Sequence, residues 1–446
     1  MSAIKVGIIG YPLGHSMSQY IHERIMEAAG ISGRYEVMEI SPKELPTYAP
    51  ILLREFTGFN VTIPHKVALV PYMDELDARV QEYGALNTVC RRVGYNTDAD
   101  GFLSLGMDFA GKKVLVTGAG GVSRMMTCEA AKAKGKVTVL ARSLEKAAAL
   151  QSELRGKGLS IDITDSVDDY GMAEIFLQGT PCGMWPNIHE AAPGIEAIDA
   201  NTLVFDTIYN PKPTKLLLTA KKRGAKTLSG LSMLFYQALA AEKIWSPEAD
   251  FADERMARLL PEIEKEMLRN YPMKIVLTGF MGAGKTEIGR MLAAELRVPF
   301  VDLDEEIVRV AGCPIREIFA RDGEESFRRM ESAVFLEVMK HKERAVVSLG
   351  GGAVMREENR KVLAASNART VFLRAPIDVL WERIHGDEGR PMLQGGDDLS
   401  STDAQYRHAE ALYLSRIPLY EEIADVTADA TRSPEDVLRN VMDALS

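Results

Sequence analysis

Two segments of this 446-residue chain combine a short apolar strand, a glycine-rich turn and an amphipathic helix. They are Lys113–Ala133 and Lys274–Leu296. Such a turn lets the backbone approach a phosphate group at the N-terminus of the following helix, as happens in parallel α/β sheets. Each segment therefore predicts its own doubly wound sheet. Strand-like runs alternate with helix-length segments through the rest of the chain, which is typical of α/β architecture.

The length of the chain exceeds what one hydrophobic core supports, so several domains are expected. Apolar residues recur at helical spacing over Phe251–Asn270, and Tyr271-Pro272 then favours the end of that helix. The strand Met273–Thr278 follows directly. We therefore place a domain border between the helix and this strand.

Composition and charge exclude several classes of protein. The net charge of -10 disfavours binding to nucleic acid. The start of the chain reads as a strand rather than a cleaved signal, and no apolar run is long enough to cross a bilayer. The cysteines are too far apart for a disulfide framework or a zinc site; they are Cys90, Cys128, Cys182 and Cys313. We expect a soluble cytoplasmic protein that binds small molecules and no membrane, and nothing in the sequence indicates an oligomeric state.

The first glycine turn follows the strand Lys113–Thr117. An acidic residue after the next strand binds the ribose of NAD, whereas an arginine suits the 2′-phosphate of NADP. Here the strand Lys136–Leu140 is followed by Arg142, Ser143 and Lys146. NADP(H) is therefore the predicted cofactor, and a solvated basic helix start is the alternative. The predicted pyrophosphate-binding residues are Gly118, Ala119, Gly120, Gly121 and Val122.

The second glycine turn has the P-loop pattern between a strand and a helix, and it predicts an ATP site. In such loops the backbone N–H groups surround the phosphates, a lysine reaches the β and γ groups, and a hydroxyl faces Mg²⁺. Lys285 and Thr286 have these last two roles. The loop residues predicted to contact ATP are Gly279, Gly282, Ala283 and Gly284.

The first half of the chain also carries small polar residues in short, dense motifs. They read Gly14-His-Ser16-Met-Ser18, Gly58-Phe-Asn60-Val-Thr62-Ile-Pro-His-Lys66, Gly84-Ala-Leu-Asn87-Thr and Asn96-Thr-Asp98, with Tyr209-Asn-Pro and Gly230-Leu-Ser-Met-Leu-Phe-Tyr-Gln237 further on. From residue 5 to about residue 240, this order of motifs resembles the shikimate dehydrogenase family. Gln19 and Ala99 depart from residues that are frequent in that family, which puts the local shape of two loops in doubt.

The resemblance implies a role for each motif. Lys66 and Asp98 would form the catalytic pair, because reduction of a ketone leaves an oxygen that must gain a proton. A structural ion pair between the two is the alternative. Gly230 would contact NADP. The substrate-binding residues implied by the resemblance are Ser16 and Ser18 for the carboxylate, Asn60, Thr62, Asn87 and Gln237 for ring hydroxyls, and Tyr209.

The part from residue 273 to 446 resembles shikimate kinases. The matching segments are Asp302-Leu-Asp304, Asp322–Glu331, Ser348–Ala353, Arg390-Pro-Met-Leu and Arg416–Tyr420. The resemblance implies that Asp304 orients the attacking hydroxyl, that Asp302 serves the Mg²⁺ site, and that Arg390 reaches the transferring phosphate. Asp304 could also cap the helix that follows. The remaining implied residues are Arg328, Gly351, Gly352 and Arg416 for shikimate, and Arg383 and Arg432 for adenine.

Together these patterns predict three α/β units. A substrate domain (1–101 with 230–270) and a Rossmann NADP domain (102–229) form a dehydrogenase, and a P-loop kinase domain covers 273–446. The predicted chemistry is NADPH-dependent reduction of 3-dehydroshikimate to shikimate, followed by phosphorylation of shikimate with ATP and Mg²⁺. The alternatives are a quinate/shikimate dehydrogenase of broader specificity fused to a P-loop small-molecule kinase, a catalytically silent binding protein and a P-loop switch protein.

Overall fold

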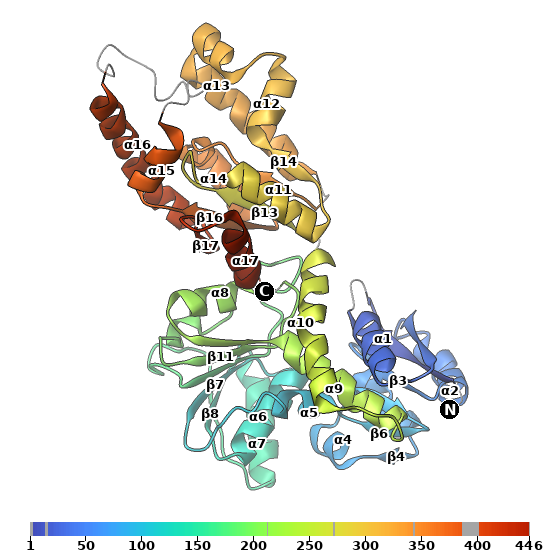
Figure 1. Ribbon diagram of the computed structural model, residues 1–446. Coiled ribbons are helices and arrows are strands. Elements are labelled where there is room, and N and C mark those ends of the chain that lie inside the picture. Colours follow the sequence, from blue (N-terminus) through green and yellow to red (C-terminus); the bar gives the residue numbers. More distant parts are fainter. Residues whose placement is uncertain are drawn as a thin grey trace. The chain divides into compact units, whose positions relative to one another are not determined.

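The computed structural model describes residues 3–13, 17–211, 213–270, 273–341, 344–385 and 401–445. The chain divides into two compact units, Met1–Met267 and Leu268–Ser446. The first unit holds two six-stranded sheets and the second holds one five-stranded sheet (Figure 1). Within these ranges, no helix is long and apolar enough to cross a membrane.

The N-terminal sheet of the first unit has the order β2-β1-β3-β5-β6-β4. Its β1 is parallel to both β2 and β3, whereas β5 is antiparallel to β3 and β6. The strands are β1 (Ile4–Gly10), β2 (Gly33–Glu39), β3 (Gly58–Val61), β4 (Glu75–Leu76), β5 (Thr88–Cys90) and β6 (Val93–Tyr95). The helices around this sheet are α1 (Ser18–Ala28), α2 (Leu45–Glu55), α3 (His65–Ala68), the 3-10 helix η1 (Val70–Tyr72), α4 (Ala78–Tyr83) and α5 (Asp98–Leu103).

The second sheet is entirely parallel, with the order β12-β11-β10-β7-β8-β9. The predicted strands Lys113–Thr117 and Lys136–Leu140 are confirmed as β7 and β8. The other strands are β9 (Asp162–Thr164), β10 (Ile175–Gln178), β11 (Leu203–Asp206) and β12 (Lys226–Ser229). Its helices are α6 (Gly121–Lys132), α7 (Leu144–Gly156), the 3-10 helix η2 (Ile195–Ala197) and α8 (Lys215–Lys222).

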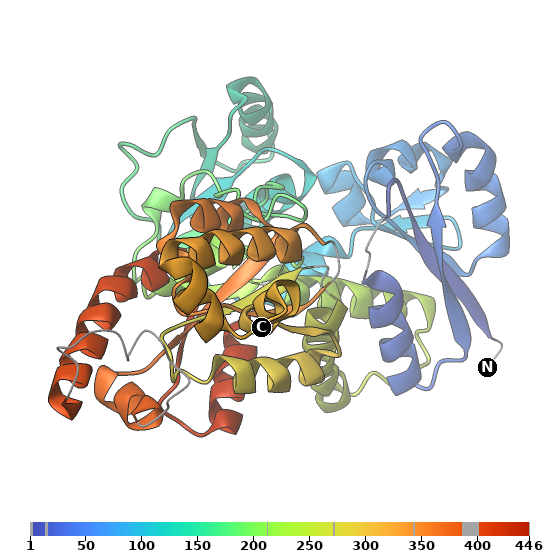
Figure 2. The ribbon, with the colours of Figure 1, turned by 90° about the horizontal axis from the view of Figure 1, so that it is seen from above.

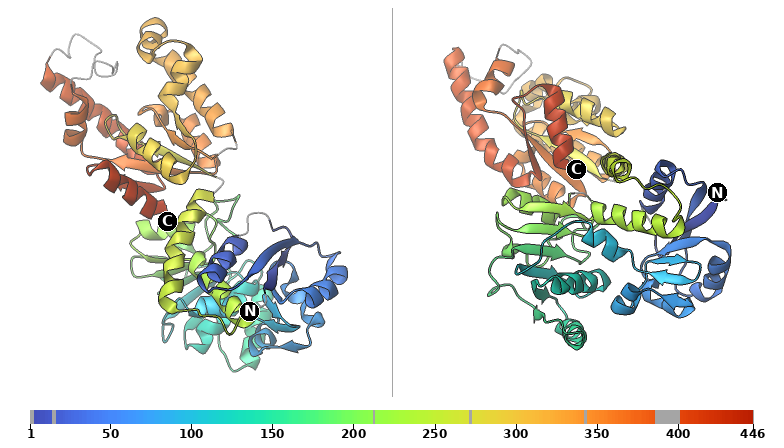
Figure 3. Two further views of the ribbon diagram at one scale, coloured as in Figure 1. Left: turned by 45° about the vertical axis from the view of Figure 1, so that its right-hand side comes forward. Right: turned by 60° about the horizontal axis from the view of Figure 1, so that its bottom comes forward.

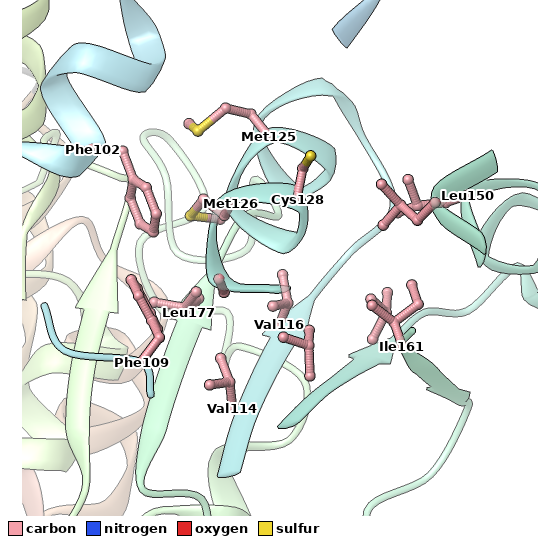
Figure 4. Close-up of a cluster of buried hydrophobic side chains, with 14 of the residues drawn as sticks. Phe102, Phe109, Val114, Val116, Met125, Met126, Cys128, Leu150, Ile161 and Leu177 are labelled. Atoms are coloured by element: carbon pink, nitrogen blue, oxygen red, sulfur yellow. The ribbon is translucent and has the colours of Figure 1, made fainter. Parts of the chain in front are cut away.

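Two hydrophobic cores lie on opposite faces of this sheet, and successive side chains of its central strands point into one or the other. Val114 and Val116 of β7 face the core that contains α6 and α7, whereas Leu115 between them faces the core that contains α8. Successive side chains of a strand point to opposite faces, so a parallel sheet covered on both sides needs an apolar residue at nearly every position. Figure 4 shows the first of these cores, with Phe102 and Phe109 beside the strands.

Two long helices, α9 (Gly230–Trp245) and α10 (Asp253–Asn270), follow the second sheet. Helix α9 packs against α1 and α5 of the N-terminal part, and it also contacts β12 (Figure 3). The crossing with α5 is close, because a Cβ added to Gly101 would lie 2.3 Å from the Met233 carbonyl oxygen. Helix α10 lies in the segment where apolar spacing predicts a helix.

The second unit has a parallel sheet in the order β14-β15-β13-β16-β17, with helices packed around it (Figure 2). Its strands are β13 (Lys274–Thr278), β14 (Phe300–Asp302), β15 (Val346–Ser348), β16 (Ala368–Arg374) and β17 (Val426–Asp429). Its helices are α11 (Lys285–Leu296), α12 (Leu303–Ala311), α13 (Ile315–Lys340, kinked at Gly323), the 3-10 helix η3 (Ala353–Met355), α14 (Glu357–Ala365), α15 (Ile377–Ile384), α16 (Thr402–Ile423) and α17 (Pro434–Leu445).

Candidate active sites

In the first unit, Lys66 and Asp98 come from two short helices and meet as an ion pair. The Lys66 Nζ donates to Asp98 Oδ2 at 2.5 Å. Lys66 lies in α3, and Asp98 is the first residue of α5. Their side chains are 31% and 19% exposed, so the pair remains within reach of a ligand. An ammonium beside a carboxylate can deliver a proton and stabilise a developing oxyanion.

The Asn87 side chain joins this pair to helix α9. Its Nδ2 donates to Asp98 Oδ1 at 2.9 Å and lies 3.3 Å from Gln237 Oε1. Its Oδ1 accepts from the backbone N–H of Thr97 at 2.7 Å, which fixes the orientation of the amide. The structure therefore brings four of the predicted residues, Lys66, Asn87, Asp98 and Gln237, into one polar group.

Asn60 extends the same polar group on the other side of Asn87. Its Nδ2 donates to Thr88 Oγ1 at 3.1 Å and to the Asn87 carbonyl oxygen at 3.4 Å. Thr62 follows two residues later, at the carboxyl end of β3, and is half-buried. Ser18 is buried at the start of α1. The predicted carboxylate-binding residue Ser16 lies outside the described residues.

The first glycine turn lies at the point where the strand order of the second sheet reverses, between β7 and β10. Ligands of open α/β sheets bind at this place, outside the carboxyl ends of the strands. Gly118 has a φ of +94°. Gly120 and Gly121 face open space, since a Cβ added to either meets no atom within 4 Å. Ala119 and Val122 anchor the turn, because both pack on the core beneath it. The turn thus leaves backbone accessible to a pyrophosphate.

A second loop borders this turn and had not been predicted. The Ser123 hydroxyl lies 3.1 Å from the Thr117 carbonyl oxygen and 3.2 Å from that of Gly179, so it connects the ends of β7 and β10. A Cβ added to Gly118 would lie 2.9 Å from the Thr180 methyl group. The loop after β10 therefore forms the second wall of the dinucleotide crevice. In the sequence, only the pair Gly179-Thr180 after a buried strand pointed to this loop.

The basic residues after β8 lie at the start of α7. Ser143 caps this helix and accepts from the Lys146 N–H at 3.4 Å, and Arg142 is exposed. Elsewhere at the carboxyl edge, Gly230 packs so closely that an added Cβ would lie 2.0 Å from the Thr207 carbonyl oxygen. Burial raises the pKa of the Tyr209 phenol, which follows β11, so the hydroxyl keeps its proton.

In the second unit, the P-loop follows the central strand β13 and opens α11. Gly279, Gly282 and Gly284 all have positive φ, which residues with side chains rarely adopt. The Lys285 Nζ donates to the carbonyl oxygens of Gly279 and Phe280 at 2.9 and 3.0 Å. The lysine is thereby folded back over its own loop, in reach of a phosphate bound there.

A hydroxyl and a carboxylate meet beside the P-loop. The Thr286 Oγ1 donates to Asp302 Oδ2 at 2.8 Å, and the other Asp302 oxygen accepts from the Asp304 N–H at 3.0 Å. Oxygen atoms of this kind are the ligands that Mg²⁺ prefers, so the residues fit a magnesium site next to bound phosphates. The cap of α12 is Asp302. The alternative, that the Asp302-Leu-Asp304 segment caps the helix, holds for Asp302 and not for Asp304, which is an exposed residue of the first turn of α12.

Three consecutive glycines after β15 lie against the predicted shikimate residues. A Cβ added to Gly350 would lie 2.8 Å from Asp304 Oδ1, and one added to Gly352 would lie 2.3 Å from Arg328. Arg416 donates to the Gly351 carbonyl oxygen at 3.3 Å. The two arginines are nearly buried, as suits paired hydrogen bonds to a carboxylate.

Glu331 is a site residue to which the sequence assigned no role. Its Oε2 accepts from the Arg328 guanidinium at 2.8 Å. Burial raises the pKa of this carboxyl, and the charges of Arg328 and Arg416 oppose that rise. This contact and the longer ones from Arg328 Nε and Nη2 to Glu324 Oε1, at 3.4 and 3.3 Å, hold the guanidinium in place. In the sequence, Glu331 ends the segment Asp322–Glu331 that resembles shikimate kinases, but its spacing of three from Arg328 is common in helices and indicated no role.

The two arginines predicted to contact adenine have different partners in the structure. Arg383 donates to the Gly282 carbonyl oxygen of the P-loop at 3.3 Å. Arg432 lies after β17 and pairs with Asp429. Within the described ranges, no hydrogen bond joins Arg432 to the P-loop. Arg390, predicted to reach the transferring phosphate, lies outside the described residues.

Comparison with known proteins assigns a family to each part. Residues 8–89 match the shikimate dehydrogenase substrate binding domain, and residues 281–446 match shikimate kinase. A shikimate dehydrogenase (NADP(+)) of Moorella thermoacetica is 35% identical over 257 residues, which is 54% of this chain and 87% of that protein.

Solved structures agree with this assignment. A shikimate dehydrogenase in complex with NADP+ has 34% identity and a TM-score of 0.53, covering 58% of this chain and 95% of its own. A shikimate 5-dehydrogenase of Thermus thermophilus in complex with NADP(H) and shikimate has 28% identity and a TM-score of 0.53, covering 58% and 99%.

The basic residues after β8 lead to a test of cofactor choice. We predict that Arg142→Ala weakens binding of NADP+ on the order of tenfold or more and leaves that of NAD+ nearly unchanged, because only NADP+ has the 2′-phosphate. Equilibrium titration of both dinucleotides measures the two dissociation constants. Arg155→Ala, which removes an exposed arginine at the end of the same helix, is the matched control. Equal weakening of both dinucleotides would show that Arg142 does not contact the 2′-phosphate.

Proposed function

Because this chain belongs to the shikimate dehydrogenase family and also carries a shikimate kinase domain, we propose that it catalyses two consecutive steps, in which the product of the first site is the acceptor of the second. The first unit reduces 3-dehydroshikimate to shikimate with NADPH. The second unit phosphorylates shikimate with ATP. The observation that carries this proposal is the presence, in one chain, of the Lys66–Asp98 pair and of a P-loop whose neighbours are two buried arginines and Asp304.

In the first step, NADPH supplies the hydride to the ketone carbon, and the carbonyl oxygen takes up a proton. We assign delivery of that proton to Lys66, with Asp98 holding the ammonium in place and exchanging the proton with solvent. Ser16 and Ser18 bind the carboxylate, and Asn60, Thr62, Asn87, Tyr209 and Gln237 bind the rest of the substrate. Gly118–Val122, Arg142, Ser143, Lys146 and Gly230 hold the dinucleotide.

In the second step, ATP supplies the phosphoryl group and Mg²⁺ compensates its charge. The shikimate hydroxyl loses its proton to Asp304 while its oxygen bonds to phosphorus, and ADP leaves. Thr286 and Asp302 face the magnesium site. Lys285 and Arg390 compensate the charge on the phosphoryl oxygens, because that charge spreads in the transition state. We assign the acceptor to Arg328, Arg416, Gly351 and Gly352, and the adenine to Arg383 and Arg432.

A cytoplasmic location fits the use of NADPH and ATP and stays a prediction. A broader dehydrogenase that also accepts quinate is the second candidate, because Gln19 and Ala99 depart from the family's frequent residues; both lie in the first turns of helices, α1 and α5, and not in the loops expected from the sequence. Rates measured with both acids and both dinucleotides distinguish the two candidates.

The role of Lys66 can be tested by removing its charge. We predict that Lys66→Met lowers the turnover of 3-dehydroshikimate reduction by a factor on the order of 10²–10⁴, the usual loss when positioned acid–base catalysis is removed. Phosphorylation of added shikimate should be unchanged. Lys43→Met, which removes an exposed lysine of the same unit, is the control. A Lys66→Met protein that reduces the ketone at the parent rate would exclude Lys66 from proton delivery.

The two-step function can be tested in a single reaction mixture. With 3-dehydroshikimate, NADPH, ATP and Mg²⁺, the parent chain should form 3-phosphoshikimate, observed by mass spectrometry. With Lys285→Met, the reactions should stop at shikimate, because the P-loop lysine compensates the charge of the phosphates. If the parent chain also forms shikimate but no 3-phosphoshikimate, the second activity is absent.

A further inference from the structure

A buried aromatic side chain outside the predicted set, Tyr35 of β2, lies directly behind the substrate-binding residues of the first unit. It is 3% exposed. Its hydroxyl donates to Asn60 Oδ1 at 2.8 Å. The Ser18 hydroxyl forms a second hydrogen bond at the same phenolic oxygen. One buried atom therefore connects the two residues to which the proposed function assigns the carboxylate and a ring hydroxyl of the substrate.

The ring of Tyr35 is held in place by a buried aromatic and ionic cluster. His22 stacks on it with ring centroids 4.3 Å apart and planes at 17°. The Nδ1 of His22 lies 2.7 Å from Glu242 Oε1, and both side chains are fully buried. Trp245 packs beside both rings and donates from Nε1 to the Val89 carbonyl oxygen at 2.9 Å. The phenol therefore has no freedom to swing away from Asn60.

The same cluster aligns two helices that carry substrate residues. Ser18 and His22 lie one turn apart on α1, so they share a face of that helix. Gln237 and Glu242 both lie on α9. The His22–Glu242 contact thus ties the helix that carries Ser18 to the helix that carries Gln237.

The hydrogen bonds of Asn60 determine which of its atoms can meet a ligand. Its Nδ2 faces two protein acceptors, the Thr88 hydroxyl and the Asn87 carbonyl oxygen, and this uses both amide hydrogens. A flipped amide would place its oxygen against the Asn87 carbonyl oxygen, which is repulsive. The amide oxygen therefore lies on the Tyr35 side, and one of its two lone pairs remains for a substrate hydroxyl.

The protonation state of Tyr35 agrees with its role as the donor of the hydrogen bond to Asn60. Burial, and then the charge of Glu242, raise the pKa of the phenol well above its usual value. The hydroxyl consequently keeps its proton over the range in which enzymes work. Its hydrogen remains available to Asn60.

We propose that Tyr35 is a positioning residue of the dehydrogenase site: its hydroxyl holds the Asn60 amide so that the amide oxygen accepts a hydrogen bond from a substrate hydroxyl, and it links this residue to Ser18. This inference rests on the role proposed above for Asn60. It assigns Tyr35 an effect on substrate affinity without contact to the substrate.

The test is Tyr35→Phe, which removes the hydroxyl and keeps the stacked ring. The KM for 3-dehydroshikimate should rise about threefold to tenfold, the usual effect of one lost hydrogen bond. The kcat and the KM for NADPH should stay within about a factor of two. A partly unfolded sample lowers the apparent kcat but leaves KM unchanged, so a rise in KM alone separates positioning from lost structure. Tyr48→Phe, at an exposed tyrosine of the same unit, is the matched control.

A double mutant shows whether Tyr35 acts through Asn60. In an Asn60→Ala background, Tyr35→Phe should leave the KM unchanged, because the group that it positions is gone. A parental KM in Tyr35→Phe, or the same rise in both backgrounds, would overturn the inference. A loss in kcat without a rise in KM would do so as well. A parental KM in Asn60→Ala alone would instead refute the role proposed for Asn60.

Discussion

The close crossing of α5 and α9 is the contact on which the first active site depends. Gly101 has no side chain, and this lets α9 approach α5 until the Met233 carbonyl oxygen lies only 2.3 Å from the position that a Cβ would take. Asp98 begins α5 and Gln237 lies on α9, so the crossing sets the separation of these two residues. Asn87 then bridges them. A larger residue at position 101 would separate the helices and with them the polar group.

The two units place their chemistry by the same rule. In each, a glycine turn follows a buried parallel strand and opens a helix, which leaves backbone N–H groups at the carboxyl edge of the sheet. The two units differ in how they bind the substrate that is not a nucleotide. The first unit gathers residues from the segments around its N-terminal sheet and from the returning helix α9. The second binds its acceptor with side chains that converge on one glycine run, Gly350–Gly352.

Sequence patterns predicted the parts of the structure that local rules determine. The strands β7 and β8 were predicted to the residue, because apolar runs end at glycine or at a basic helix start. The chemistry-bearing residues Lys66, Asp98, Lys285 and Asp302 stood in short motifs. The sequence left open which aspartate of Asp302-Leu-Asp304 caps α12, because two aspartates beside a helix start look equivalent until the backbone angles are known; the cap is Asp302.

Contacts between distant segments could not be predicted in this way. His22 and Glu242 are 220 residues apart, and neither lies in a motif. Tyr35 reads as an ordinary buried residue of a strand. The role of these residues follows only from the packing of α1, β2 and α9. The loop after β10 was missed for a related reason, because its place beside the first glycine turn depends on the order of the strands.

The central claim is that one chain holds two separate sites for one small acid, the product site of the first reaction and the acceptor site of the second. Calorimetric titration with shikimate, without NADP+ or ATP so that no turnover occurs, tests it most directly. The account predicts two molecules of shikimate per chain, one lost in Asn60→Ala and the other in Arg416→Ala. A single bound molecule per chain, or loss of both through one of these substitutions, would contradict it.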